Sequence, residues 1–249
     1  MIEEFVLTLP LKVESWQADI LNNRYEHLRR IYNMVQRRLL RHYIYFSQQN
    51  VYRQCENNDE KREFWRNHPV TIKEIFDKNG NPAIVRFPHT YHTRSKSSGK
   101  RTSNGIPDLL PKLKNRNIGS GQTYASLGIN ASILENLGLR IEQAWVKRLY
   151  DPKSKHISFK EEGDLNTFGC REKDGFSGFV LDLQRMILSF NTNGKQGKTA
   201  KFIHLPINPD KELTEYEMYS LKGGLSRSED YCCPRICPWQ IQVLRSAHY

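Results

Sequence analysis

Residues 16–48 carry the longest periodic pattern in the chain, and this pattern predicts one continuous amphipathic helix. At 100° per residue, nine apolar side chains of the stretch fall within a single arc of the helix surface. They are Ile20, Leu21, Leu28, Ile31, Tyr32, Val35, Leu39, Tyr43 and Phe46. Ser15 comes just before the pattern and is a residue type that often caps a helix N-terminus. We therefore expect a helix from about residue 16 whose apolar arc is buried.

The opposite side of the same helix is basic. No Asp or Glu occurs between His27 and Cys55, whereas six arginines do: Arg29, Arg30, Arg37, Arg38, Arg41 and Arg53. Arg30, Arg37 and Arg41 lie within about 60° of one another around the helix. A solvated helix face usually mixes both signs, because pairs of opposite charge four residues apart stabilise it. Arginine also suits forked contacts with phosphate oxygens, so we favour a helix that faces nucleic acid. Its candidate binding residues are Arg30, Arg37, Arg38 and Arg41.

A second basic stretch covers residues 88–121, which are rich in turn residues and which we expect to form a loop. Six of its basic residues are candidates for phosphate contact, and its single acid is Asp108. The six are Lys96, Lys100, Arg101, Lys112, Lys114 and Arg116. A flexible solvated loop explains residues 93–105 best. Such a loop can also become ordered on a phosphate backbone, so both interpretations stay open.

The formal net charge of the whole chain is +11. A surplus of this size points to nucleic acid as a partner, and only secondarily to an anionic membrane. Neither terminus pairs a basic amphipathic segment with a Trp/Phe-rich face, which argues against the membrane. No apolar run approaches the roughly 20 residues needed to span a bilayer, and the first residues lack the positive charge of a signal peptide. We expect a cytoplasmic protein without disulfide bonds.

The remaining pattern predicts a mixed α+β fold. Helical segments are expected at 56–69, from Thr123 to about residue 150, and at 213–224. In the second of these, the apolar side chains of Ile133, Leu137, Ile141, Trp145 and Leu149 recur every four residues. Strands are expected at 2–13, in a hairpin at 73–87 that turns at Asn79-Gly80, and at 156–168, 178–190 and 200–208, where the apolar period changes to two.

Catalytic motifs are missing from the sequence. Asp182 is the residue that a small metal-dependent nuclease of the RNase H type would use, with Glu212, Glu215 and Glu217 as further carboxylates. A polar outward position on a strand explains Asp182 more simply. Cys233 and Cys237 supply half of a zinc site, for which His248 is the one further ligand downstream. We therefore expect no catalytic residue, no metal and no cofactor.

Two segments carry a resemblance to a known family. The first is FVLTLPLKVESWQADILNNRYEHLRRIYNMVQRRLLRHY at residues 5–43, which includes the Tyr32-Asn33 pair. The second is GFVLDLQRMILSFNTNGKQGKTAKFIHLPI at 178–207, followed by LTEYEMYSLKGG at 213–224. The first resembles the opening of transposon-encoded TnpB proteins and their relatives, the type V CRISPR effectors. The second resembles the place where that family returns from its helical recognition lobe to its wedge barrel.

The resemblance implies a fold and a function for residues 1–224. It implies a first wedge strand at 1–14, a helical recognition lobe with a β-hairpin and a basic loop at 15–154, and a wedge part at 155–224. The lobe would be inserted into a partial, incomplete wedge-type β-barrel. The implied partners are a guide RNA and, through the RNA–DNA heteroduplex, a DNA target, both gripped by backbone and shape. No position matches the RuvC-like catalytic triad of the family, so the resemblance implies binding without nuclease activity. A general basic RNA-binding protein is the remaining alternative.

Residues 225–249 do not continue this pattern. They contain Cys232, Cys233 and Cys237 together with two prolines, and little alternation. We interpret them as the product of out-of-frame translation after about Gly224, in preference to a private extension of the fold or a zinc half-site. Such a tail should be disordered or weakly packed. Because four apolar residues near its end alternate imperfectly, a strand on an open barrel edge is the alternative.

Overall fold

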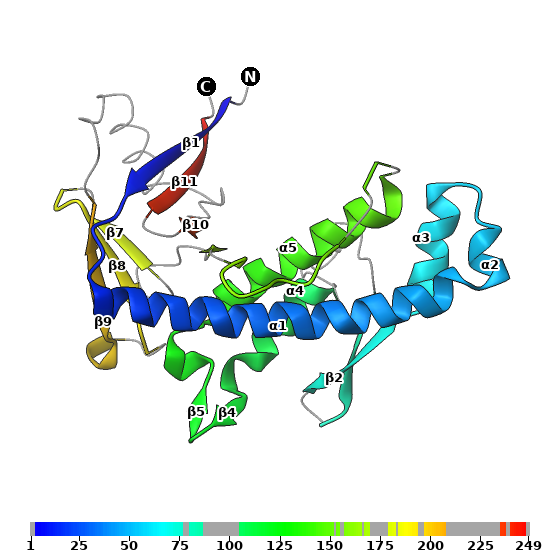
Figure 1. The fold of residues 1–249 in the computed structure, drawn as a ribbon, viewed down its shortest axis with the longest axis horizontal. Coiled ribbons are helices and arrows are strands. Elements are labelled where there is room, and N and C mark those ends of the chain that lie inside the picture. The colour runs from blue at the N-terminus through cyan, green and yellow to red at the C-terminus, as the bar shows by residue number, and fades with distance from the viewer. Residues whose placement is uncertain are drawn as a thin grey trace, which may run out of the picture. The chain divides into compact units, whose positions relative to one another are not determined.

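The computed structural model shows an α+β fold of helices and small antiparallel sheets (Figure 1). It describes residues 3–76, 80–86, 105–151, 153–154, 157–165, 167–169, 179–182, 184–193, 197–207, 235–237 and 240–247. The chain divides into two compact units, and α1 (Ser15–Ser47) contributes residues to both. The first unit contains residues 1–26, 117–133 and 163–249, and the second contains residues 27–116 and 134–162.

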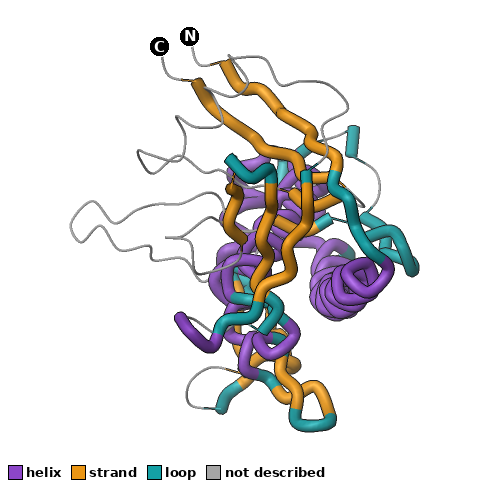
Figure 2. Tube along the Cα trace, turned by 90° about the vertical axis from the view of Figure 1, so that its left-hand side faces the viewer, coloured by secondary structure: helices purple, strands orange, loops and turns teal. Residues whose placement is uncertain are grey.

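The first unit holds a four-stranded antiparallel sheet in the order β1-β11-β10-β6. Its strands are β1 (Glu3–Pro10), β6 (Phe168–Gly169), β10 (Arg235–Cys237) and β11 (Gln240–Ala247). β1 and β11 lie side by side along their whole length, from Glu3 opposite Ala247 to Pro10 opposite Gln240 (Figures 1 and 2). Disorder was therefore the wrong expectation for residues 235–237 and 240–247, which form strands, and β11 lies between β1 and β10 rather than at an edge of the sheet. The backbone of β1 offers an unpaired edge, and the end of the tail pairs with it.

A second sheet of this unit has the order β7-β8-β9 and is antiparallel throughout. Its strands are β7 (Phe179–Asp182), β8 (Ile187–Asn191) and β9 (Phe202–Pro206), with a short 3₁₀ helix η3 (Gly197–Thr199) in the β8–β9 connection. Leu188, Phe190, Ile203 and Leu205 are buried. The strands predicted at 178–190 and 200–208 are confirmed, although a turn splits the first of them into β7 and β8.

Residues 117–133 complete the first unit. They form a small hairpin of β4 (Asn117–Gly119) and β5 (Gln122–Thr123) and the 3₁₀ helix η2 (Ala125–Leu127), and then lead into α5 (Ala131–Tyr150). The strand predicted over 156–168 is wrong for residues 157–165, which are irregular, and only Phe168–Gly169 is a strand. Gly163 has a φ of +84°, a left-handed conformation that interrupts an extended chain.

The second unit is built on α1 and α5. The other elements are α2 (Asn50–Arg53), α3 (Asn58–Asn67), α4 (Ile106–Leu109), the 3₁₀ helix η1 (Leu110–Asn115) and the hairpin of β2 (Val70–Phe76) and β3 (Pro82–Val85). The long helix and the charged helix near residue 60 are confirmed. The hairpin is also present but begins at Val70, and the helix expected after Thr123 begins at Ala131. The first intrahelical bond of α1 runs from Ala18 N–H to the carbonyl of Glu14, so Glu14 rather than Ser15 is the cap position.

Residues 106–113 differ from the expected loop. They form α4 and the start of η1, and four apolar side chains at helical spacing are buried there: Ile106, Leu109, Leu110 and Leu113. Turn-forming residues on both sides hid this short pattern. The apolar arc of α1 is confirmed, with most of its members buried and Ile20, Tyr43 and Phe46 half-buried. Within the described ranges, no helix combines the length and the apolar character that crossing a membrane requires.

Candidate nucleic-acid interface

The second unit fixes which face of α1 is exposed. The apolar side of the helix packs inward through Leu28, Ile31, Val35 and Leu39, each at most 2% exposed. This burial determines the rotation of the helix about its axis, because 3.6 residues make one turn. Arg30, Arg37 and Arg41 consequently lie on the solvent side, and all three side chains are exposed.

Four of the arginines of α1 fall into two groups by their contacts. Arg29 donates from Nη1 to the carbonyl of Lys160 at 3.0 Å, and Arg38 is bound to a carboxylate. Neither Arg37 nor Arg41 has a hydrogen-bond or ion-pair partner in the part of the chain that the structure describes. Arg37 and Arg41 therefore keep the guanidinium donors that a phosphate group would accept from.

Glu74 of β2 holds Arg38 and also contacts a member of the second basic group. Arg38 Nε lies 2.9 and 3.0 Å from the two carboxylate oxygens of Glu74, and Arg38 Nη2 lies 2.5 Å from Oε1. Arg116 Nη1 donates to the backbone carbonyl of Glu74 at 2.8 Å. Lys112 and Lys114 on η1 and Arg116 just after it are exposed. We call Arg30, Arg37, Arg41, Lys112, Lys114 and Arg116 the basic surface.

The contact between Arg38 and Glu74 affects both titrating groups. The hydrogen bonds from Arg38 lower the pKa of Glu74 below its ordinary value of 4.5. The same hydrogen bonds raise the pKa of Arg38. Each side chain is 27% exposed, so solvent screens the pair and its contribution to stability stays near 1 kcal/mol. Arg38, which the sequence grouped with the phosphate-binding arginines, has a structural partner instead.

This ion pair predicts a dependence of stability on acid. Because the pKa of Glu74 is lower in the folded than in the unfolded chain, its contribution is complete above pH 4.5. It is lost as the pH falls through the lower, folded value. In urea unfolding followed by circular dichroism, wild type should lose about 1 kcal/mol more than Glu74→Gln between roughly pH 5 and pH 3. Equal losses in the two proteins would contradict the pairing.

Residues 157–162 border the basic surface on the side of α1 that carries Asn33. The side-chain amide of Asn33 donates to the carbonyl of Lys160 at 2.8 Å and accepts from the Lys160 N–H at 2.9 Å. The Asn33 side chain thereby supplies the hydrogen-bond partners that a neighbouring strand would give to the Lys160 backbone. This explains why the segment is not itself a strand. Glu161 and Glu162 follow and are exposed. The absence of acids thus holds for residues 27–55 of the sequence only, and two carboxylates directly follow Lys160, whose backbone is bonded to α1.

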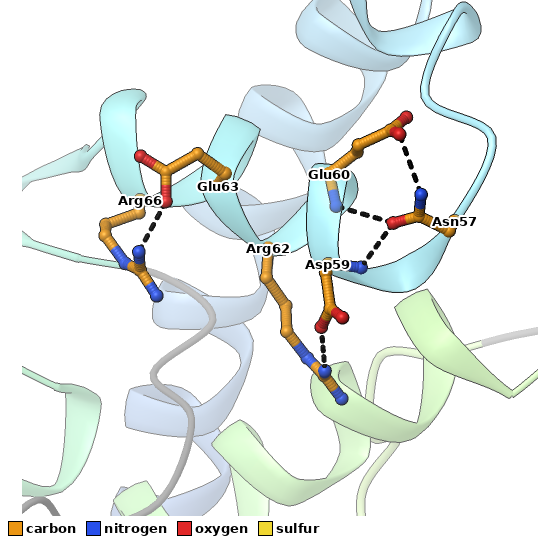
Figure 3. A network of polar contacts seen from close by, with 6 residues as sticks. All are labelled: Asn57, Asp59, Glu60, Arg62, Glu63 and Arg66. Carbon is orange, nitrogen blue, oxygen red and sulfur yellow. Dashed lines mark hydrogen bonds and ion pairs between the residues drawn. The ribbon is translucent and has the colours of Figure 1, made fainter.

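The neighbouring helix α3 shows what an ordinary solvated helix looks like in this protein. Its polar network consists of Asn57, Asp59, Glu60, Arg62, Glu63 and Arg66 (Figure 3). Asn57 Oδ1 caps the helix by accepting from the N–H groups of Asp59 and Glu60, both at 2.9 Å. Arg62 pairs with Asp59 at 2.6 Å, and Arg66 pairs with Glu63, each three residues apart. Every arginine of α3 is neutralised locally, in contrast to Arg37 and Arg41.

Several of the predicted residues cannot be placed. Lys96, Lys100 and Arg101 lie outside the described residues, as do Cys232 and Cys233 and the acids Glu212, Glu215 and Glu217. Cys55 is a free thiol. Among the described residues, no three His, Cys, Asp or Glu side chains are arranged to hold a metal ion.

Asp182, the residue of the rival nuclease interpretation, shapes a turn. Its Oδ1 accepts from the N–H groups of Gln184 and Arg185, each at 3.0 Å, and Arg185 Nε lies 3.8 Å from Oδ2. Met186, at the end of this turn, has a φ of +50°. An aspartate that accepts from the backbone two residues ahead is the usual device for such turns. The carboxylate therefore has a structural role between β7 and β8.

The structure thus shows a helix whose exposed Arg37 and Arg41 have no partner among the described residues, and a second group of exposed cations in the same unit. No protein-family model matches the chain, and no curated protein matches it.

Proposed function

We propose that the protein binds nucleic acid through the basic surface and does not cleave it. One observation carries the proposal: Arg37 and Arg41 are exposed without a partner among the described residues, while Arg29 and Arg38 on the same helix are bonded. Two exposed arginines that have no partner among the described residues, four positions apart on a helix, suit the regularly spaced charges of a phosphate backbone. The net charge of +11 supports the same class of partner.

The finer proposal follows from the resemblance to TnpB-like proteins. The chain would grip a guide RNA and the guide–target heteroduplex by backbone and shape, as a helical lobe joined to wedge-type strands. Two features support this. The Asn33 side chain holds the segment at Lys160 to α1, which gives the Tyr32-Asn33 pair a defined place. The end of the first segment also meets the 155–224 part, because Leu11 forms an antiparallel bridge with Ile207 and the Lys12 N–H donates to the carbonyl of Pro206.

The test compares two pairs of arginines on helices of the same unit. Arg37 and Arg41 are changed together to glutamine in the full chain, and affinity for labelled RNA is measured by fluorescence anisotropy at several salt concentrations. Each lost phosphate contact should reduce the slope of log K against log salt by about 0.7 on a single strand and about 0.9 on a duplex. The double variant should therefore bind more weakly, with a slope smaller by about 1.5.

The matched control is Arg62→Gln with Arg66→Gln on α3, which removes the same charge from residues already paired with acids. It should change the slope little. An equal effect of both pairs would mean that only net charge matters and would remove α1 from the interface. Metal-dependent cleavage that disappears in Asp182→Asn would replace the proposal with the nuclease.

A further inference from the structure

Tyr45 lies in the last turn of α1 and has the most exposed large hydrophobic side chain among the described residues, at 65%. Its ring meets the ring of Phe46 edge to face, with 4.9 Å between their centroids. Phe46 is itself half-buried among the rings of Phe64, Trp65 and His68. The Tyr45 hydroxyl has no hydrogen-bond partner in the described part of the chain. The ring is thus supported from one side by a packed cluster and remains open to a ligand.

The position of Tyr45 on α1 relates it to the basic surface. Arg37, Arg41 and Tyr45 are spaced four residues apart, so they form one row along the helix, with steps of about 6 Å. Along this row come two arginines that have no partner among the described residues, followed by an exposed aromatic ring. Proteins that bind single-stranded nucleic acid combine these two elements: cations follow the backbone, and aromatic rings stack on unpaired bases.

We infer that Tyr45 is a stacking platform for an unpaired base of a single strand whose backbone runs along Arg37 and Arg41. The inference rests on the proposed function and makes it more specific. A base inside a duplex already has both faces covered by its neighbours, whereas an unpaired base offers a free face to the ring. The arginines supply affinity for phosphate, and Tyr45 supplies the preference for single strands.

The experiment uses the full chain and two labelled probes, an oligouridine of about 12 nucleotides and an RNA duplex of about the same length. Affinity is measured by fluorescence anisotropy for wild type, Tyr45→Ala and Tyr45→Phe. Tyr45→Ala should weaken binding of the oligouridine about 5- to 150-fold, the range expected for one stacked base, and leave its salt slope unchanged. Binding of the duplex should stay within about twofold. Tyr45→Phe, which keeps the ring, should restore the affinity.

Ile44→Ala is the matched control, because Ile44 is the adjacent exposed apolar residue, at 48%, and has no aromatic face. It should change the affinity for either probe little. Circular dichroism establishes that each variant is folded. Photocrosslinking with 5-iodouridine in the oligouridine should in addition label the peptide that contains Tyr45.

The possible failures are distinct. If wild type binds neither probe, both the proposed function and the stacking site are wrong. If wild type binds the oligouridine and Tyr45→Ala binds it equally well, the stacking site alone is wrong. A similar loss on both probes, or a loss that Tyr45→Phe does not restore, also rejects stacking, because each would show that the change acts on something other than an unpaired base.

Discussion

Replacing Trp145 with alanine is expected to lower the free energy of unfolding by about 3–5 kcal/mol. Trp145 is 1% exposed on α5, and its Nε1 donates to Gln36 Oε1 on α1 at 2.9 Å. Its ring also meets that of Tyr43, with 5.7 Å between the centroids. Alanine would leave a cavity and remove the donor to a fully buried amide. Urea unfolding followed by circular dichroism measures the loss.

Two further variants separate packing from hydrogen bonding at this position. Trp145→Phe retains most of the packing but leaves the Gln36 oxygen without this donor, so it should cost about 1–3 kcal/mol. Adding Gln36→Leu removes the orphaned amide and should recover part of the loss. If Trp145→Ala costs less than about 1 kcal/mol, α1 and α5 do not pack as the structure shows, and the exposed face of α1 would need to be reassigned.

Replacing Gly128 with valine is expected to destabilise the first unit by about 3 kcal/mol or more. Gly128 has a φ of +74°, which side chains rarely adopt, and a Cβ there would overlap the Arg24 guanidinium and lie 2.7 Å from the Asn191 carbonyl. Arg24 is 1% exposed and cannot move freely. It donates to the carbonyls of Leu127 and Asn191, both at 2.9 Å, and its guanidinium carbon lies 4.6 Å from the centre of the Phe190 ring. The measurement is again the free energy of unfolding in urea.

Gly163→Val provides the control, because Gly163 has a similar φ of +84° but nothing within 4 Å of its Cβ position. It should cost only the backbone strain, about 1–2 kcal/mol. The difference between the two variants isolates the crowding around Arg24. Equal costs would show that the space beside Gly128 is not occupied as the structure has it.

Local patterns in the sequence determined much of the fold of this protein. The periodicity over 16–48 and the apolar residues from Ile133 to Leu149 identified α1 and α5, because burying one face of a helix needs a repeat of 3.6 residues. Alternation identified the β7–β8–β9 region, and the β2–β3 hairpin was expected from Asn79-Gly80, of which Asn79 lies outside the described residues. The spacing of Ile106, Leu109, Leu110 and Leu113 was an equally regular signal for α4 and η1 that the surrounding turn residues obscured.

Tertiary structure decided the contacts between distant residues. Residues 157–165 alternate like a strand, yet the backbone at Lys160 bonds to the side chain of Asn33, 127 positions away in sequence. The pairing of β11 with β1 joins residues from opposite ends of the chain. Neither contact can be predicted from the neighbouring sequence, because a backbone N–H or C=O group can form hydrogen bonds with many kinds of partner.

The candidate interface was also predictable only in part from the sequence. Periodicity placed Arg30, Arg37 and Arg41 on one side of a helix, but nothing local showed that Arg29 and Arg38 have partners whereas Arg37 and Arg41 have none among the described residues. The structure separates them because Glu74 lies 36 positions from Arg38 and the Lys160 carbonyl lies 131 positions from Arg29. Those partners are brought to α1 by the packing of its apolar face, which sets the rotation of the helix and so leaves Arg37, Arg41 and Tyr45 facing solvent.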